Sequence, residues 1–319
     1  MADFQFYSPE DVIAVNLRES AERTCTVWEQ EMAHLRELAS HVTEESAPNA
    51  EFAHTLPEHR PPRFSELFRN LRADARFGQQ LAQIRTTEQA VYLCLEICKQ
   101  FRQHGAVAEE ALLTEESEEL AEHARDRIIY QRNSYADNAY LCFAELLKSP
   151  RALYAHSFSA ICEEVYNGSA EFCILPLESS SEGMLNSFAR LIDRYELKTV
   201  ATCDVPATDA QRSTRFALLR RDLVPLPVPP HSKHRLFACS ARLDASPSPA
   251  ELLCAAQLCG LELYRLDSRV PIDGEDPHAH TLHYVFRLGQ SDLSAFLLYL
   301  SMEVPHCTLD GFYFHIEQK

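Results

Sequence analysis

Residues 170–183 read AEFCILPLESSSEG, and residues 213–216 read STRF. The first segment is a short apolar run that ends at Pro176, followed by a polar turn and a periodic segment with Met184 and Phe188. This pattern predicts a strand, a loop and the start of a helix. A helix start beside a sheet offers backbone N–H groups and the positive end of the helix dipole, which suits a carboxylate. An ordinary strand-to-helix turn would have the same spacing.

The same residues resemble the signatures of one enzyme family. PLESSSEG at 176–183 is similar to the P-I-E-N-S-x-x-G signature of prephenate dehydratases, and TRF at 214–216 is similar to their T-R-F motif. Upstream, IYQ at 129–131 followed by SY at 134–135 resembles the segment that opens the dehydratase, with Arg132 in place of its glycine. The motifs also occur in the order that this family has.

The resemblance covers 128–319, because the C-terminal part resembles the ACT domain that follows the dehydratase in this family. Carried over residue by residue, it implies catalytic roles for Thr214, Arg215 and Glu178, and substrate contacts for Ser179, Ser180, Gly183 and Phe216. It further implies a small-molecule carboxylate or an aromatic amino acid as the ligand. Neither a cofactor nor a metal is expected.

One departure from the family concerns the second lobe. The resemblance implies two α/β lobes with the active site in the cleft between them, the second lobe being inserted before the T-R-F strand. Here only 197–213 fills that interval, which is too short for a lobe, since one parallel crossover with its helix already takes about a dozen residues. Ser179 also stands where the family has Asn, so an amide donor and acceptor is lost.

We therefore expect a prephenate dehydratase-like protein, associated with phenylalanine biosynthesis, that is catalytically degenerate and acts as a ligand-sensing or regulatory protein. One alternative is an active, divergent dehydratase that converts prephenate to phenylpyruvate. A further alternative is a bifunctional protein that also has chorismate mutase activity.

Composition narrows the class of partner. The chain has 319 residues, 46% of them apolar, and a net charge of −17. Such a charge argues against a nucleic-acid or anionic-membrane partner, because phosphate binding needs a basic face. The first residues carry no basic region followed by an apolar one, and no apolar run approaches the length of a membrane span, so we expect a cytoplasmic protein.

The eleven cysteines form no C-x-x-C pair and lie mostly in apolar periodic segments. They indicate free thiols rather than a disulfide framework. The nearest approach to a metal cluster is Asp276, His278, His280 and His283, which we interpret as part of a solvated loop between two strands.

The first 125 residues are predicted to be all-helical, with apolar periodicity in 17–42, 64–81, 88–104 and 106–125. From Leu17 to Val42, apolar residues recur at steps of three and four, as in a bundle or a coiled coil. A lone helix cannot bury such a stripe, so we expect a homodimer or a higher homo-oligomer. A helical chorismate mutase precedes the dehydratase in many bacteria, but its K…D…RE pattern is not found here. We therefore expect a degenerate mutase or a dimerisation bundle, with an active mutase as the alternative.

The rest of the chain divides into three parts. Residues 126–224 alternate short apolar runs with helical segments, which predicts a single three-layer α/β lobe with a largely parallel sheet, like half of a periplasmic binding protein. Residues 225–233 are rich in proline and form a stiff linker. Residues 234–319 have the order βαββαβ, which is the ferredoxin-like arrangement and also that of ACT domains.

The C-terminal part carries its own candidate ligand site. Asp267, Ser268 and Arg269 resemble the E-S-R-P segment of phenylalanine-binding ACT domains, with Asp in place of Glu and Val270 in place of Pro. We expect these three residues to contact the ligand. The sequence PSP at 247–249 stands where that family has its G-A-L turn. Its stiffness argues against backbone binding of an amino-acid carboxylate there.

Overall fold

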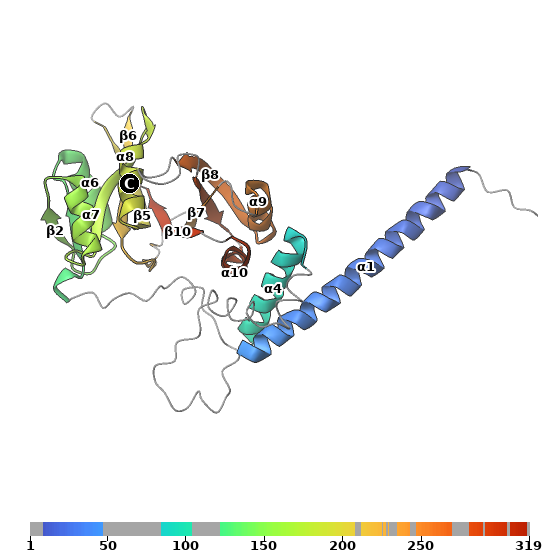
Figure 1. The fold of residues 1–319 in the computed structure, drawn as a ribbon. Coiled ribbons are helices and arrows are strands. Elements are labelled where there is room, and N and C mark those ends of the chain that lie inside the picture. The colour runs from blue at the N-terminus through green and yellow to red at the C-terminus, as the bar shows by residue number, and fades with distance from the viewer. Residues whose placement is uncertain are drawn as a thin grey trace, which may run out of the picture. The chain divides into compact units, whose positions relative to one another are not determined.

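The computed structural model describes residues 9–46, 84–103, 122–207, 212–224, 226–227, 229, 235–242, 247–269, 281–289, 291–304 and 307–317. These residues belong to two compact units, one made of two helices and the other running from 122 to 317. The mixed α and α/β class expected from the sequence is confirmed (Figure 1).

The first unit contains α1 (Pro9–Ser46) and α4 (Thr87–Gln103), which pack against each other. Arg36 Nε donates a hydrogen bond of 2.8 Å to the hydroxyl of Tyr92, and the stripe residue Leu35 is buried. Toward the N-terminus, Leu17 is 67% exposed and Trp28 is 56% exposed. Within the described part of the chain, only the C-terminal portion of the predicted stripe is therefore covered.

Of the predicted helical segments, 64–81 and all but the last four residues of 106–125 lie outside the described residues. The described part of the second unit begins with a short turn of 3₁₀ helix, η1. Its elements follow in this order: η1 Glu122–Ala124, β1 Arg127–Tyr130, α6 Ser134–Ala144, β2 Arg151–Tyr154, α7 Phe158–Tyr166, β3 Phe172–Ser179, β4 Gly183–Met184, α8 Asn186–Arg194, β5 Lys198–Pro206, β6 Ser213–Arg220, β7 Arg235–Arg242, α9 Pro249–Leu258, β8 Leu261–Arg269, β9 Thr281–Leu288, α10 Leu293–Glu303 and β10 Thr308–Ile316.

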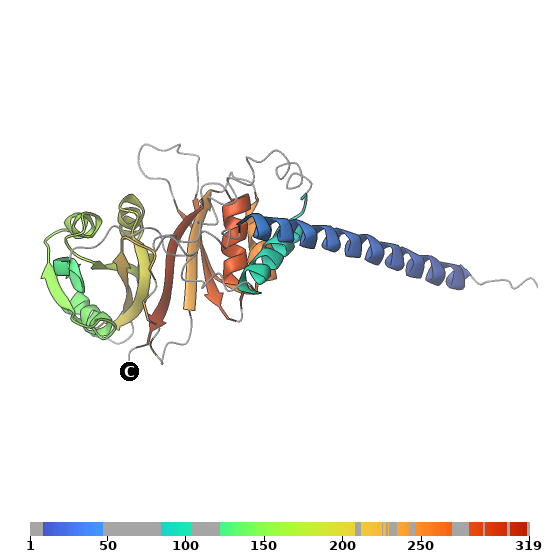
Figure 2. The ribbon, with the colours of Figure 1, turned by 90° about the horizontal axis from the view of Figure 1, so that it is seen from below.

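The described strands of this unit form one ten-stranded sheet. Its order is β2-β1-β3-β6-β5-β10-β7-β9-β8, with β4 paired to β3 beside this path. In Figures 1 and 2 the sheet can be followed from β2 at one edge to β8 at the other. The regions predicted as lobe and C-terminal domain thus share a single sheet, joined where β5 and β10 pair in parallel.

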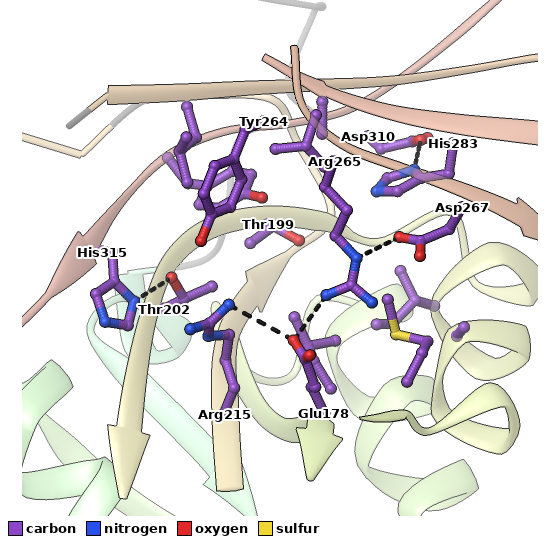
Figure 3. Close-up of a pocket in the computed structure, with 18 of the residues that line it drawn as sticks. Glu178, Thr199, Thr202, Arg215, Tyr264, Arg265, Asp267, His283, Asp310 and His315 are labelled. Carbon is purple, nitrogen blue, oxygen red and sulfur yellow. Dashed lines mark hydrogen bonds and ion pairs between the residues drawn. The ribbon is translucent and has the colours of Figure 1, made fainter. Parts of the chain in front are cut away.

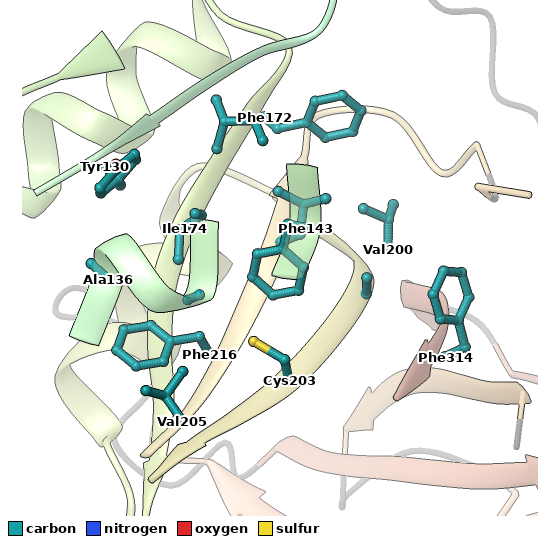
Figure 4. Packing of buried hydrophobic residues seen from close by; sticks show 14 residues of the cluster. Tyr130, Ala136, Phe143, Phe172, Ile174, Val200, Cys203, Val205, Phe216 and Phe314 are labelled. Carbon is teal, nitrogen blue, oxygen red and sulfur yellow. The ribbon is translucent and has the colours of Figure 1, made fainter. Parts of the chain in front are cut away.

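The lobe has three layers, as expected. On one face of the sheet, Ala136, Ala139 and Phe143 of α6 pack on Ile174 and on other strand residues in a buried apolar cluster (Figure 4). On the other face, α7 and α8 form a second cluster whose buried residues include Ile161, Cys162, Val165 and Ile192. Because strand side chains alternate between faces, neighbouring strand residues enter different clusters.

The expectation of a largely parallel sheet is wrong for β6. The β1 strand pairs in parallel with β2 and β3, but β6 lies antiparallel between β3 and β5. The physical reason is the short connection 207–212, in which the backbone N–H of Ala207 donates to the carbonyl of Arg212 at 2.7 Å. A parallel neighbour would require a crossover, whereas a short loop suffices for an antiparallel hairpin.

The C-terminal part has the expected order βαββαβ, with the spatial strand order β10-β7-β9-β8. The PSP segment is the start of α9: Ser248 caps the helix, Pro249 opens it, and Glu251 bonds back to Ser248 in a capping box. At the junction of the sheet, a Cβ on Gly311 would lie 2.8 Å from the carbonyl oxygen of Thr199. Glycine is therefore needed for the close pairing of β10 with β5.

Candidate functional site

The strands β3 and β6 bring the two family-like motifs together. Ser179 lies opposite Thr214 and Glu178 lies opposite Arg215. The TRF strand therefore runs beside the residues of the Glu178 turn. Pro176 pairs with Phe216, and the regular pairing of β3 with β6 is interrupted between Pro176 and Glu178.

This interruption leaves Leu177 as an extra residue on β3. Pro176 has no N–H to donate to a ladder, so a bulge is expected beside it. In an unbroken ladder, alternation would place Glu178 on the same face as Thr214. The bulge instead turns Glu178 to the face of Arg215, and the two predicted catalytic groups Thr214 and Arg215 line different pockets.

The pocket on the face of Thr214 lies at the ends of β1 and β3, where α6 and α7 begin. We call it the Thr214 pocket, lined by Gln131, Asn133, Tyr135, Ala136, Phe158, Ile174, Pro176, Thr214 and Phe216. Its polar groups are hydroxyls and amides. The crevice beyond the carboxyl ends of parallel strands is the usual ligand position in open α/β sheets.

The start of α6 supplies the rim of this pocket. Asn133 is the N-cap, and its Oδ1 accepts from the backbone N–H groups of Tyr135 at 3.1 Å and Ala136 at 2.9 Å. Gln131 Nε2 donates to the carbonyl of His156 at 3.1 Å. Two of the amides that a helix start could offer to an anion are therefore bonded within the chain.

The turn after Glu178 differs from the prediction. The periodic segment from Gly183 does not start the helix: β3 continues to Ser179, Gly183 and Met184 form β4, and α8 starts at Asn186. Gly183 has φ +74°, a conformation that favours glycine. Ser180 bonds to the strand edge instead, its N–H donating to the carbonyl of Ser213 at 2.9 Å. Ser180 and Gly183 thus belong to a hairpin turn and present no helix start to a carboxylate.

The opposite face holds a second pocket, which we call the charged cavity (Figure 3). It lies between β3, β6 and α8 of the lobe and β8, β9 and β10 of the C-terminal part. Its polar lining consists of Glu178, Thr199, Thr202, Arg215, Tyr264, Arg265, Asp267, Arg269, His283, Asp310, Tyr313 and His315. Apolar lining comes mainly from Leu177, Met184, Ile192, Leu236 and Val285.

Glu178 is shared by two arginines in the charged cavity. Its Oε2 lies 2.7 Å from Arg265 Nη1 and 3.5 Å from Arg215 Nη1. Arg265 Nε lies 2.6 Å from Asp267. Arg215 is held on its other side by Asp204, whose two carboxylate oxygens accept from Nε at 2.8 Å and Nη2 at 2.9 Å. Burial opposes the ionised form of Asp204, but this bidentate pairing outweighs it and lowers the pKa of that carboxyl.

A second charged group lies deeper in the cavity. Nδ1 of His283 is 2.7 Å from Asp310 Oδ2 and 3.1 Å from Ser240 Oγ. Burial alone would raise the pKa of Asp310, but His283, Arg269 and Ser240 overcome it and lower that pKa to about 2. Serine and aspartate meet the same ring nitrogen, whereas a nucleophilic triad needs them on opposite nitrogens. This group is therefore arranged to hold charge and not to activate Ser240.

His315 completes the polar lining beside Arg215. Its Nδ1 is 3.1 Å from the hydroxyl of Thr202, and its Nε2 is 3.4 Å from Asp204. Burial lowers the pKa of His315, partly offset by the charge of Asp204. The imidazole is thus biased toward its neutral form.

The sequence-predicted site residues are divided between these places. Thr214 and Phe216 line the Thr214 pocket, whereas Glu178 and Arg215 line the charged cavity. Of the residues expected to bind an ACT ligand, Asp267 and Arg269 line the charged cavity. Ser268, between them, points to the other face of β8 and is exposed.

Sequence reasoning missed Arg265, His283 and Asp310 as parts of one cavity. The alternation of charge at 265, 267 and 269 is a signal for one polar strand face, because side chains repeat with period two. His283 was placed in a solvated loop, but it lies on β9 and is buried. Nothing in the sequence pattern relates it to Asp310, which comes from a different strand.

The other members of the possible metal cluster, Asp276, His278 and His280, lie outside the described residues. Among the residues that are described, no group of three or more His, Cys, Asp or Glu is placed to hold a metal ion. The described helices include none that is long and apolar enough to cross a membrane.

No protein-family profile and no curated protein matches this chain. Among solved structures, it is similar to a prephenate dehydratase from Streptococcus mutans, with 20% identity and a TM-score of 0.48 over 59% of this chain and 98% of that one. It is similar to the quorum quenching acylase GqqA, with 19% identity and a TM-score of 0.45 over 60% and 95% of the two chains. It is also similar to a prephenate dehydratase from Arthrobacter aurescens in complex with L-Phe, with 14% identity and a TM-score of 0.43 over 59% and 89%. With TM-scores below 0.5, these similarities do not by themselves indicate a function.

Proposed function

We propose that this chain is a prephenate dehydratase-like protein that binds a small carboxylate or an aromatic amino acid and turns over prephenate very weakly or not at all. Its role is then ligand sensing or regulation, in connection with phenylalanine biosynthesis. One observation carries the proposal: the described lining of the Thr214 pocket contains no cationic side chain, because Arg215, the next residue on the strand, faces the charged cavity on the other side of the sheet.

The chemistry explains why this separation matters. Decarboxylative dehydration of prephenate requires two carboxylates to be held, an acid beside the departing hydroxyl and the exclusion of water. Thr214 supplies a hydroxyl, but the described lining of its pocket contains no Lys, Arg or His. Arg215 is bound on the far face by Asp204 and Glu178. The residues needed to hold prephenate beside Thr214 are therefore not assembled.

The connection before β6 supports the same proposal. Most of 197–213 is taken by β5, and 207–212 joins it directly to β6. This interval adds a hairpin to the sheet rather than a second wall over Thr214. A site completed by a second copy of the chain is the alternative, and it would restore the active enzyme.

The decisive experiment measures conversion of prephenate to phenylpyruvate, followed by the absorbance of the product in base. We expect turnover far below the ordinary enzyme range of about 1 to 10³ s⁻¹. Thr214→Val is compared with Thr24→Val, a matched change on exposed α1. Turnover within the ordinary range that Thr214→Val abolishes and Thr24→Val leaves intact would refute the proposal and establish an active dehydratase.

We also propose a four-part organisation: a helical dimerisation region, the dehydratase-like lobe, the proline-rich linker and an ACT-like C-terminal domain. The βαββαβ order and the antiparallel pairing of β10, β7, β9 and β8 support the last part.

The exposed stripe at Leu17 and Trp28 supports a homodimer through α1, because it continues the row of apolar residues that α4 covers at Leu35. Sedimentation of Trp28→Glu beside wild type tests this: we expect a dimer that the charge dissociates, and a monomeric wild type at micromolar concentration would contradict it.

A further inference from the structure

We infer that the charged cavity binds a small monocarboxylate with a short apolar or aromatic body, and that the ligand's carboxylate takes the place of Glu178 between Arg215 and Arg265. The class of ligand in this inference is taken from the proposed function. It assigns that ligand to the face of the sheet opposite Thr214. Figure 3 shows Glu178 between Arg215 and Arg265.

The first reason is the way in which Glu178 is bound. One of its oxygens, Oε2, serves both arginines, at 2.7 Å from Arg265 and 3.5 Å from Arg215. The longer distance lies outside the usual range of about 2.7 to 3.2 Å for an N–H···O hydrogen bond. A carboxylate placed with one oxygen toward each guanidinium would bond to both, which is the geometry that arginine favours.

The second reason is that carboxylates other than Glu178 hold both arginines in place. Asp204 fixes Arg215 and Asp267 fixes Arg265, so both cations are already oriented. Their side chains are 28% and 26% exposed, which leaves them accessible to a ligand from solution. A preorganised site spends less free energy on ordering side chains when the ligand binds.

The third reason is an unused donor beside an apolar wall. Arg269 binds Asp193 through Nη1 at 2.5 Å, but its Nε is buried and has no hydrogen-bond partner among the described residues. A buried donor without a partner costs free energy that a water admitted with the ligand can recover, since the two oxygens of the ligand are directed to Arg215 and Arg265. Leu177, Ile192 and Val285 line the same cavity and can accept the apolar body of the ligand.

This arrangement makes Glu178 an internal competitor of the ligand. The ligand gains its full contacts only in molecules whose Glu178 has left Arg215 and Arg265, so the apparent affinity falls by the fraction in that state. Removing the charge of Glu178 should therefore strengthen ligand binding. A purely structural clasp predicts the opposite, because loss of the clasp would loosen the cavity and weaken binding.

Calorimetric titration of the full chain with phenylacetate tests the inference, and neutral phenylacetamide serves as the matched probe. We expect phenylacetate to bind and phenylacetamide not to. Arg265→Gln should weaken binding by about 10-fold or more, as charge-assisted hydrogen bonds are lost. Glu178→Gln should strengthen it by about 3- to 10-fold, since it frees the two arginines of a bond of ordinary net strength. Thr214→Val, on the other face, should leave phenylacetate binding unchanged.

Several outcomes would overturn the inference: no binding of phenylacetate to wild type, equal binding of the amide, or weaker binding to Glu178→Gln. Loss of binding in Thr214→Val would place the ligand in the other pocket and likewise refute it. If Arg265→Gln does not fold, as judged by circular dichroism, Glu178→Gln decides alone through its sign. Prephenate turnover is measured separately, so a failure of the proposed function is recognised independently of this result.

Discussion

The two faces of the lobe sheet carry different pockets beside their apolar clusters. Toward α6, the buried cluster around Phe143 and Phe216 leads to a pocket of hydroxyls and amides at Thr214. Toward α8, the cluster with Ala217 and Leu219 leads to the arginines and carboxylates of the charged cavity. Both pockets draw on the same two strands. A single bulge at Leu177 therefore decides which face receives the charge of Glu178.

The largest effect should come from the apolar side of this comparison. Phe143 is fully buried, and Phe143→Ala should lower the free energy of unfolding by about 3 to 5 kcal/mol, through lost transfer energy and a cavity. Leu141→Ala on the same helix is the matched control, since Leu141 is 63% exposed, and it should change stability by less than about 0.5 kcal/mol. Urea unfolding measures both. Equal effects would show that the α6 face is not the core of the lobe.

The charged face should respond to pH where the apolar face does not. The pKa of Asp310 is about 2, below the unfolded value of about 3.9, so its stabilisation is present above pH 4 and disappears as the pH falls toward 2. The shift corresponds to about 2 to 3 kcal/mol. Asp310→Asn should lose that amount at neutral pH.

The difference in unfolding free energy between wild type and Asp310→Asn should shrink on acidification. The difference in unfolding free energy between wild type and Phe143→Ala should stay constant between about pH 4 and pH 2. A constant difference for Asp310→Asn would mean that His283 and Arg269 do not stabilise its charge.

A substitution at the junction between β5 and β10 should disturb the charged cavity more than the Thr214 pocket. Gly311→Ala puts a methyl group 2.8 Å from the carbonyl of Thr199, so the strands must separate. Overpacking of this kind costs about 1 to 3 kcal/mol. Because β10 supplies Asp310 and His315 to the charged cavity and nothing to the described lining of the Thr214 pocket, NMR shift changes should concentrate in the cavity. Equal changes at Gln131 and Tyr135 would contradict this.

The smallest effect concerns the rim of the Thr214 pocket. Asn133→Ala removes the cap that binds the N–H groups of Tyr135 and Ala136, and should cost about 1 kcal/mol. Asn133→Ser keeps a capping oxygen and should retain most of that stability. Thermal unfolding compares the two variants. If both are equally destabilised, the cap does not contribute through its hydrogen bonds.

Much of the fold follows from local pattern. The periodicity of α4, the apolar run of β3 and the βαββαβ order are all readable from the sequence, because each depends on residues close together along the chain. The helix start at Gly183 was misplaced because a polar turn before a periodic segment looks the same whether it opens a helix or closes a hairpin. Pro176 is a sequence signal for a bulge. Whether a bulge forms there depends on the pairing of β3 with β6, which the sequence pattern does not give.

By itself, the sequence determined most of the helices and strands that the structure describes. Only the tertiary structure decided that Glu178 turns to the face of Arg215, and that Arg215 and Arg265 share it. The reason is physical. Periodicity is a property of neighbours along the chain, whereas the face that a side chain takes depends on register and bulges, and the closing of a cavity depends on strands that pair across more than a hundred residues.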